Sequence, residues 1–76
     1  MMNYDSEVDA IGLKCPMPIL RCKKALNALQ NNQILKISTT DKNATKDLKA
    51  FCHQTGHELI SFEIVGDVTS SYIRKN

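Results

Sequence analysis

The sequence predicts a small α+β domain of order βαβαββ, in which a mixed four-stranded sheet carries two helices on one face. Two stretches with apolar residues at helical spacing alternate with short runs rich in β-branched residues. Near the C-terminus, a Gly-Asp pair separates two further runs, as in a β-hairpin. The 76 residues, 42% of them hydrophobic, suffice for one core and leave no room for a second domain.

The first predicted strand and helix flank a loop that contains a cysteine. Residues 1–6 are expected to be a flexible arm of the single domain 1–76, and Val8–Ile11 to be a short strand ending at Gly12. A helix is predicted from Pro16 to about Gln30, because proline fits the first helical turn but not later ones. The apolar stripe of this helix consists of Pro18, Ile19, Cys22, Ala25, Leu26 and Leu29.

The second half of the chain continues the alternation. Ile34–Thr39 is predicted to be a strand, and Asp41 the N-cap of a helix that runs to about Gln54 and stops at Gly56. The last two predicted strands are residues 57–65, whose Ile60, Phe62 and Ile64 alternate with polar residues, and residues 68–74. The helix between the first two strands implies a parallel pair with a right-handed crossover, which places both helices on one face.

Cys15 has the strongest chemical signal in the chain, because it directly precedes Pro16 at the predicted helix start. As an N-cap, it would face unpaired N–H groups and the positive end of the helix dipole, which lower the pKa of a thiol. Lys14 acts in the same direction. Since Pro16 and Pro18 have no N–H to aim at the sulfur, we expect a moderate decrease in the pKa.

The other two cysteines are expected to be structural. Cys22 and Cys52 fall on the apolar stripes, where a thiol packs as a small hydrophobic group. Cys22 is about 10 Å of helical rise from Cys15, beyond the ~7 Å between Cα atoms that a disulfide allows. Pro18 occupies the position where a dithiol motif needs its second cysteine, and no zinc-type spacing is present. We expect no disulfide, metal site or cofactor, and interpret Cys15 as a lone nucleophile suited to carrying a group covalently.

Asp9 has two interpretations. It could assist the thiol of Cys15, but a nearby carboxylate raises a thiol pKa, which opposes activation. It could instead fix the backbone turn before Gly12, and we favour this second role.

The face of the first helix opposite its apolar stripe combines apolar and basic side chains. Met17, Leu20, Arg21 and Lys24 project from it, with Lys23 at its margin. Single exposed apolar residues are common and need have no function. The alternative interpretation is a docking surface for a protein that must reach the sulfur of Cys15.

Composition excludes several classes of protein. The net charge of +2 is too small for a general nucleic-acid footprint, where a domain pI above about 9 is typical. No apolar run approaches the roughly 20 residues of a membrane-spanning helix, and the polar, acidic N-terminus is unlike a signal peptide. We therefore expect a cytoplasmic protein without membrane association, whose thiols stay free in a reducing compartment.

Several motifs together resemble the TusA (SirA-like) family of sulfur carriers. The resemblance covers nearly the whole chain and rests on Asp9, Gly12-Leu13, Cys15-Pro16-Met17-Pro18 (the CPxP motif), Lys23-Lys24-Ala25, Asp47-Leu48, Phe51-Cys52, His57-Glu58-Leu59 and Tyr72-Ile73-Arg74-Lys75.

The resemblance implies both a fold and a function. The fold would be a two-layer α/β sandwich similar to the C-terminal domain of translation initiation factor 3. Cys15 would accept sulfur as a persulfide from a cysteine desulfurase and pass it to downstream relay proteins, ultimately for 2-thiouridine in tRNA. The family's partner-binding positions correspond to Met17, Leu20, Lys23 and Lys24. Such a protein is a sulfurtransferase-type carrier rather than a stand-alone enzyme, and we expect it to be a monomer.

Three alternatives stay open at this point. The first is a carrier in sulfur or selenium metabolism with a different acceptor. The second is a small RNA- or ribosome-binding module that uses Arg21, Lys23, Lys24, Arg74 and Lys75, although exposed aromatic residues for base stacking are few. The third is a non-covalent adaptor that docks through Met17 and Leu20.

Overall fold

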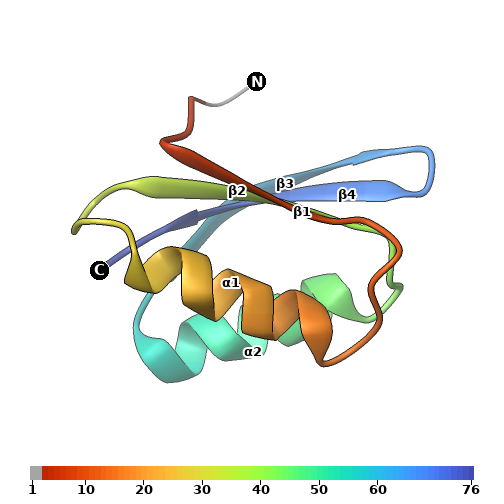
Figure 1. Cartoon of the computed structure of the whole chain (residues 1–76), viewed down its shortest axis with the longest axis horizontal. Coiled ribbons are helices and arrows are strands. Elements are labelled where there is room, and N and C mark those ends of the chain that lie inside the picture. Colours follow the sequence, from red (N-terminus) through yellow and green to blue (C-terminus); the bar gives the residue numbers. More distant parts are fainter. Residues whose placement is uncertain (1–2) are drawn as a thin grey trace.

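A computed structural model describes residues 3–76, which form one four-stranded sheet with both helices packed against the same face (Figure 1). The elements are β1 (Ser6–Ala10), α1 (Met17–Asn27), β2 (Ile34–Thr39), α2 (Ala44–Thr55), β3 (Glu58–Val65) and β4 (Val68–Arg74). The strand order is β1-β2-β4-β3, with β1 and β2 parallel and the other pairs antiparallel. The predicted α+β class, element order and mixed sheet are confirmed. Within residues 3–76, no helix is long and apolar enough to cross a membrane.

The core lies between the sheet and the two helices. The residues buried in it are Ala10, Cys22, Leu26, Leu35, Ile37, Leu48, Cys52 and Ile73. The predicted stripe is buried or half-buried at every position, but α1 ends at Asn27 instead of about Gln30, so that Leu29 lies beyond the helix. Both predicted structural cysteines are part of the core. The 3.6-residue period thus identified the inward face of α1 correctly. On α2, the face predicted from Ala44, Leu48, Phe51, Cys52 and Thr55 is buried or half-buried except at Thr55, which is exposed.

Both helices begin later than predicted. Pro16 is the N-cap of α1 and Asn43 that of α2, so the prediction that Asp41 caps the second helix is wrong. Asp41 instead forms a tight turn before the helix, in which its Oδ1 accepts the N–H of Asn43 at 3.1 Å and its carbonyl accepts that of Ala44. A short acidic side chain stabilises such a turn as readily as it caps a helix. The other carboxylate oxygen, Oδ2, accepts the N–H of Cys15, which is distant in the sequence.

The N-terminal segment is attached to the sheet from Asp5 onward. The N–H of Asp5 donates to the carbonyl of Ile34 at 2.8 Å, and its Oδ2 accepts the N–H of Ile34 at 2.8 Å. Ser6 already belongs to β1. The flexible arm predicted for residues 1–6 is therefore wrong for Asp5 and Ser6, whereas Met1 and Met2 lie outside the described residues.

Strand β3 departs from simple alternation. A bulge between Leu59 and Ser61 shifts the register, so that Leu59 packs against the core and the simple alternation predicted for residues 57–65 is wrong. The β3–β4 hairpin, closed by the predicted Gly66-Asp67 turn, extends past the helices (Figure 1). Ile64 and Val65 at its end are consequently 66% and 75% exposed.

Candidate functional site

The loops that follow β1 and β2 lie at one edge of the sheet, because neighbouring parallel strands end on the same side. The N–H of Gly12 donates to Thr40 Oγ1 at 2.8 Å, and the N–H of Cys15 donates to Asp41 Oδ2 at 3.0 Å. These two hydrogen bonds attach the cysteine loop to the loop before α2. Between them is an open hollow of about 540 Å³, lined by Gly12, Leu13, Lys14, Cys15, Thr40, Asp41, Lys42 and Asn43.

Cys15 is exposed at this edge, one residue before the N-cap of α1. The carbonyl of Pro16 accepts the first helical hydrogen bond, from the N–H of Leu20 at 3.1 Å, and the N–H of Met17 is already bonded to the carbonyl of Lys14. The prediction that Cys15 itself is the N-cap is therefore wrong by one residue. Its side chain nonetheless stands in solvent beside the start of the helix, where a reacting molecule can reach it.

The pKa of Cys15 is raised, so the predicted decrease is wrong. The first cause is a hydrogen bond between its thiol and the carboxylate of Asp47, followed by desolvation and by the negative charges of Asp47 and Asp41. A carboxylate beside a thiol opposes formation of a second negative charge. The sequence argument considered only Lys14 and the helix start, because Asp41 and Asp47 are far away along the chain.

Cys22 and Cys52 are free thiols buried between the helices and the sheet. Burial, with a smaller contribution from Cys52, raises the pKa of Cys22 to about 12. Burial alone raises the pKa of Cys52 to about 11. Both thiols stay protonated and out of reach in the folded chain, which leaves Cys15 as the accessible nucleophile among the three cysteines.

Asp9 stabilises the backbone of the turn after β1. Its Oδ1 accepts the N–H of Ile11 at 3.0 Å, immediately before Gly12, whose φ of 82° suits a residue without Cβ. This is the structural role favoured from the sequence. The carboxylates that raise the pKa of the thiol are those of Asp47 and Asp41. The predicted parallel pairing of β1 and β2 could have indicated them, because it places the loop after β2 next to the loop of Cys15.

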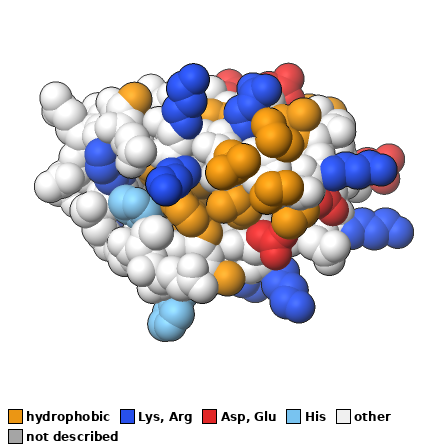
Figure 2. Space-filling model, turned by 60° about the horizontal axis from the view of Figure 1, so that its bottom comes forward, with side chains coloured by type: hydrophobic (Ala, Val, Ile, Leu, Met, Phe, Trp, Pro, Cys, Tyr) orange, Lys and Arg blue, Asp and Glu red, His pale blue; other side chains and the backbone are white. Residues whose placement is uncertain are grey.

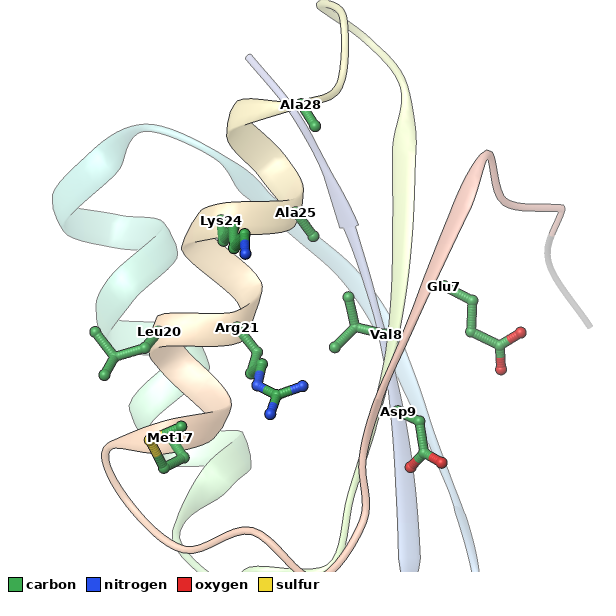
Figure 3. Close-up of a pocket in the computed structure, with 9 residues that line it drawn as sticks. All are labelled: Glu7, Val8, Asp9, Met17, Leu20, Arg21, Lys24, Ala25 and Ala28. Atoms are coloured by element: carbon green, nitrogen blue, oxygen red, sulfur yellow. The ribbon is translucent and has the colours of Figure 1, made fainter.

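A groove of about 870 Å³ runs between α1 and the free edge of β1 (Figure 3). Its lining residues are Glu7, Val8, Asp9, Met17, Leu20, Arg21, Lys24, Ala25 and Ala28. Arg21 extends from α1 into the space between helix and strand, Val8 points toward the helix, and Glu7 and Asp9 point away from it.

The predicted partner-binding residues lie on or beside this groove. Met17 and Leu20 are 39% and 53% exposed, and both line the groove with Lys24, whereas Lys23 is exposed but is not part of the lining. Figure 2 shows hydrophobic side chains gathered on the helical side of the molecule, with basic and acidic side chains around them. The face therefore combines an apolar centre with a charged margin.

The cations invoked for RNA binding do not form one free surface. Arg74 pairs with Glu58, and Lys75 Nζ donates to the carbonyl of Leu29. Arg21, Lys23 and Lys24 are exposed on α1. Two of the five cations in that alternative are thus engaged within the fold.

Comparison with known proteins shows the family to which the chain belongs. The sequence matches the family described as Sulfurtransferase TusA over residues 6–75. It is 45% identical to the sulfur carrier protein TusA of Allochromatium vinosum over 76 residues, which is all of both chains. It is 32% identical to TusA of Pseudomonas syringae, over 97% of this chain and 88% of that protein.

A solved structure supports the same architecture. The crystal structure of a SirA-like protein from Desulfitobacterium hafniense superposes with a TM-score of 0.82, covering 92% of this chain and 96% of that one, at 24% identity. A small two-layer α+β domain with one accessible cysteine at the start of its first helix is the class of protein that fold and site define. This chain belongs to the TusA family.

Proposed function

We propose that this protein is a sulfur carrier whose Cys15 alternates between a thiol and a persulfide. The observation that carries the proposal is the placement of Cys15, whose sulfur is exposed while its backbone N–H is bonded to Asp41 Oδ2 at 3.0 Å. A cysteine on a braced loop can be presented to one protein and then to another without rearrangement of the domain. The names of its relatives, as sulfur carriers, point the same way.

The chemistry conserves atoms and electrons. Cys15 Sγ attacks the outer sulfur of a donor cysteine persulfide, a new S–S bond forms, and the donor S–S bond breaks with its electron pair going to the donor cysteine. The thiol proton of Cys15 is lost to solvent, and the donor thiolate regains one. A thiol and a persulfide are thereby exchanged, and no external oxidant or reductant is needed.

The proposed donor is a cysteine desulfurase, and the proposed acceptors are downstream relay proteins that lead to 2-thiouridine in tRNA. The donor would dock on Met17, Leu20, Lys23 and Lys24, whose exposed apolar and basic side chains lie on the helix that begins beside Cys15. A monomer working in the reducing cytoplasm fits such a relay, because the carried persulfide has to stay accessible and unoxidised.

A loading experiment tests the proposal. The protein is incubated with a cysteine desulfurase and cysteine, and its intact mass is measured without reductant. The wild type is expected to gain the mass of one sulfur atom, and Cys15→Ser to gain none. Cys22→Ala and Cys52→Ala are controls that should still be loaded, because both thiols are buried. A wild type that gains no sulfur from any desulfurase tested would refute the carrier function.

A further inference from the structure

We propose that the groove between α1 and the free edge of β1 binds an extended segment of a partner protein, which pairs with β1 as an added strand and directs acidic side chains toward Arg21 and Lys24. The inference goes beyond the proposed function, because it extends the contact surface from the exposed face of α1 to the edge of the sheet. Binding there does not require the sulfur of Cys15.

Strand β1 lies at one edge of the sheet. Within residues 3–76 it pairs only with β2, and the strand order β1-β2-β4-β3 leaves its other side without a neighbouring strand. The backbone N–H and C=O groups on that side are therefore available to an added strand. Its five residues offer about 17 Å of edge, enough to pair with a segment of similar length.

The groove of about 870 Å³ along this edge gives an added strand a second surface to contact. On the helix side, the small side chains of Ala25 and Ala28 leave space between α1 and β1 (Figure 3). Met17 and Leu20 supply exposed apolar surface near the start of the helix. Because successive side chains of a strand point to opposite faces, every second side chain of the added strand would contact α1.

The cations in the groove determine the chemistry of those helix-facing side chains. Arg21 extends from α1 into the space between helix and strand, and Lys24 lines the same space (Figure 3). Both side chains are exposed, and within residues 3–76 neither forms an ion pair. Carboxylates on the added strand would pair with both cations, and the planar guanidinium of Arg21 is suited to bidentate pairing.

The strand side of the groove carries charges of the opposite sign. Glu7 and Asp9 line the edge of the groove but point away from the helix (Figure 3). Their carboxylates would repel the phosphates of RNA laid along this edge. An added strand can instead place basic or polar side chains beside them on its outer face. The groove thus favours a peptide in which acidic and apolar residues alternate with basic or polar ones.

A synthetic peptide with this pattern tests the site. The probe is the acetylated and amidated peptide Thr-Glu-Lys-Leu-Lys-Glu-Thr, whose second, fourth and sixth side chains form the acidic and apolar face. It is titrated into isotope-labelled Cys15→Ser protein, in which no thiol chemistry contributes, and binding is followed by NMR. Saturable shifts are expected for the amides of β1 and for Arg21. No saturable shift at about 5 mM peptide would overturn the proposal.

A charge-reversal variant tests the pairing with the groove. Arg21→Glu should weaken binding of the peptide about tenfold or more. Lys46→Glu reverses a charge at an exposed position of α2 outside the groove and should leave the affinity unaltered. Amide spectra verify the fold, and Arg21→Ala replaces Arg21→Glu if the latter does not fold. Equal affinities for a folded Arg21 variant and the parent protein would overturn the proposal.

Methylation of the peptide backbone tests the pairing with β1. One probe is N-methylated at its second, fourth and sixth residues and another at its two lysines, so that each keeps every side chain and loses one alternate set of N–H groups. One of these sets faces β1 in an added strand, so one of the two probes should bind about tenfold more weakly or worse. Undiminished binding of both would exclude strand addition. Sulfur loading of the wild type is measured separately, so either proposal can fail while the other stands.

Discussion

The three cysteines differ in what surrounds them, and these surroundings assign their chemistry. Cys15 is exposed, and Asp41 in the loop before α2 accepts its backbone N–H. Cys22 and Cys52 are enclosed in the core, where ionisation would place a charge among apolar side chains. At the scale of single residues, the exposed thiol is therefore available for sulfur transfer and the buried pair contributes to packing.

The buried thiols predict a loss of stability at alkaline pH. Their folded pKa values, about 12 for Cys22 and about 11 for Cys52, lie above the ordinary value of 9.0. As the pH rises above 9.0, the unfolded chain releases these protons first, so the free energy of unfolding falls up to about pH 12. Urea unfolding as a function of pH measures this decrease.

A comparison variant identifies the group responsible. Cys22→Ala should be less stable than the wild type at neutral pH and should lose less additional stability above pH 9.0. The same slope in both proteins would show that the titration of Cys22 does not contribute to the alkaline transition.

At the scale of the element, α1 has two faces with different tasks. Pro18, Cys22 and Leu26 are buried against the sheet, whereas Met17 and Leu20 are exposed beside a groove. The same helix thus anchors the cysteine loop to the core and presents the surface on which we propose that a donor docks.

Replacing Leu20 by Glu tests this docking surface. Leu20 is 53% exposed, so the change should leave thermal unfolding almost unaltered. A charged side chain in place of an apolar contact should slow persulfide loading about tenfold or more. Val65→Glu is the matched control, because it makes the same change on an exposed residue of the hairpin. Equal loading rates for both variants would exclude Leu20 from the donor interface.

The end of α2 depends on a single glycine. Gly56 has φ of 83° and its N–H donates to the carbonyl of Cys52 at 2.9 Å, a left-handed helix end. An added Cβ would meet no atom within 4 Å, so the cost of Gly56→Ala is conformational alone. We expect a loss of about 1 kcal/mol in urea unfolding. Gly56→Asn should lose less, because asparagine tolerates this conformation, and equal losses would contradict the explanation.

At the scale of the whole molecule, the helices cover only part of the sheet. Ile37 is fully buried beneath them, whereas Ile64 on the projecting hairpin is 66% exposed. Truncation of Ile37 should therefore lower the free energy of unfolding more than truncation of Ile64 does.

One identical substitution at both positions tests this division. Ile37→Val should cost about 1 kcal/mol in urea unfolding, because it removes a buried methylene group. Ile64→Val should cost less than about 0.5 kcal/mol, because the lost group is largely in solvent. Comparable losses would mean that the hairpin is packed more tightly than its exposure indicates.

Local pattern predicted the elements well and their ends less well. The strands 34–39 and 68–74 and the buried stripe of α1 agree with the structure, because residue spacing alone determines which side chains share a face. The N-caps were wrongly predicted at Cys15 and Asp41. The backbone N–H of Cys15 and the carboxylate of Asp41 bond to each other across two loops, and neither residue caps its own helix. The β3 bulge was missed because nothing in its alternation marks an extra residue.

The sequence by itself determined the α+β architecture, the burial of two cysteines and the exposure of the third, since each follows from short-range periodicity and the proline pattern. Only the tertiary structure decided the ionisation of Cys15. The parallel pairing of β1 and β2 brings Asp41 to the backbone of Cys15, 26 residues away along the chain. The negative charges of Asp47 and Asp41 are among the causes of the raised pKa of its thiol. Electrostatic interactions depend on distance in space, and the folded sheet, rather than the order of residues, sets that distance.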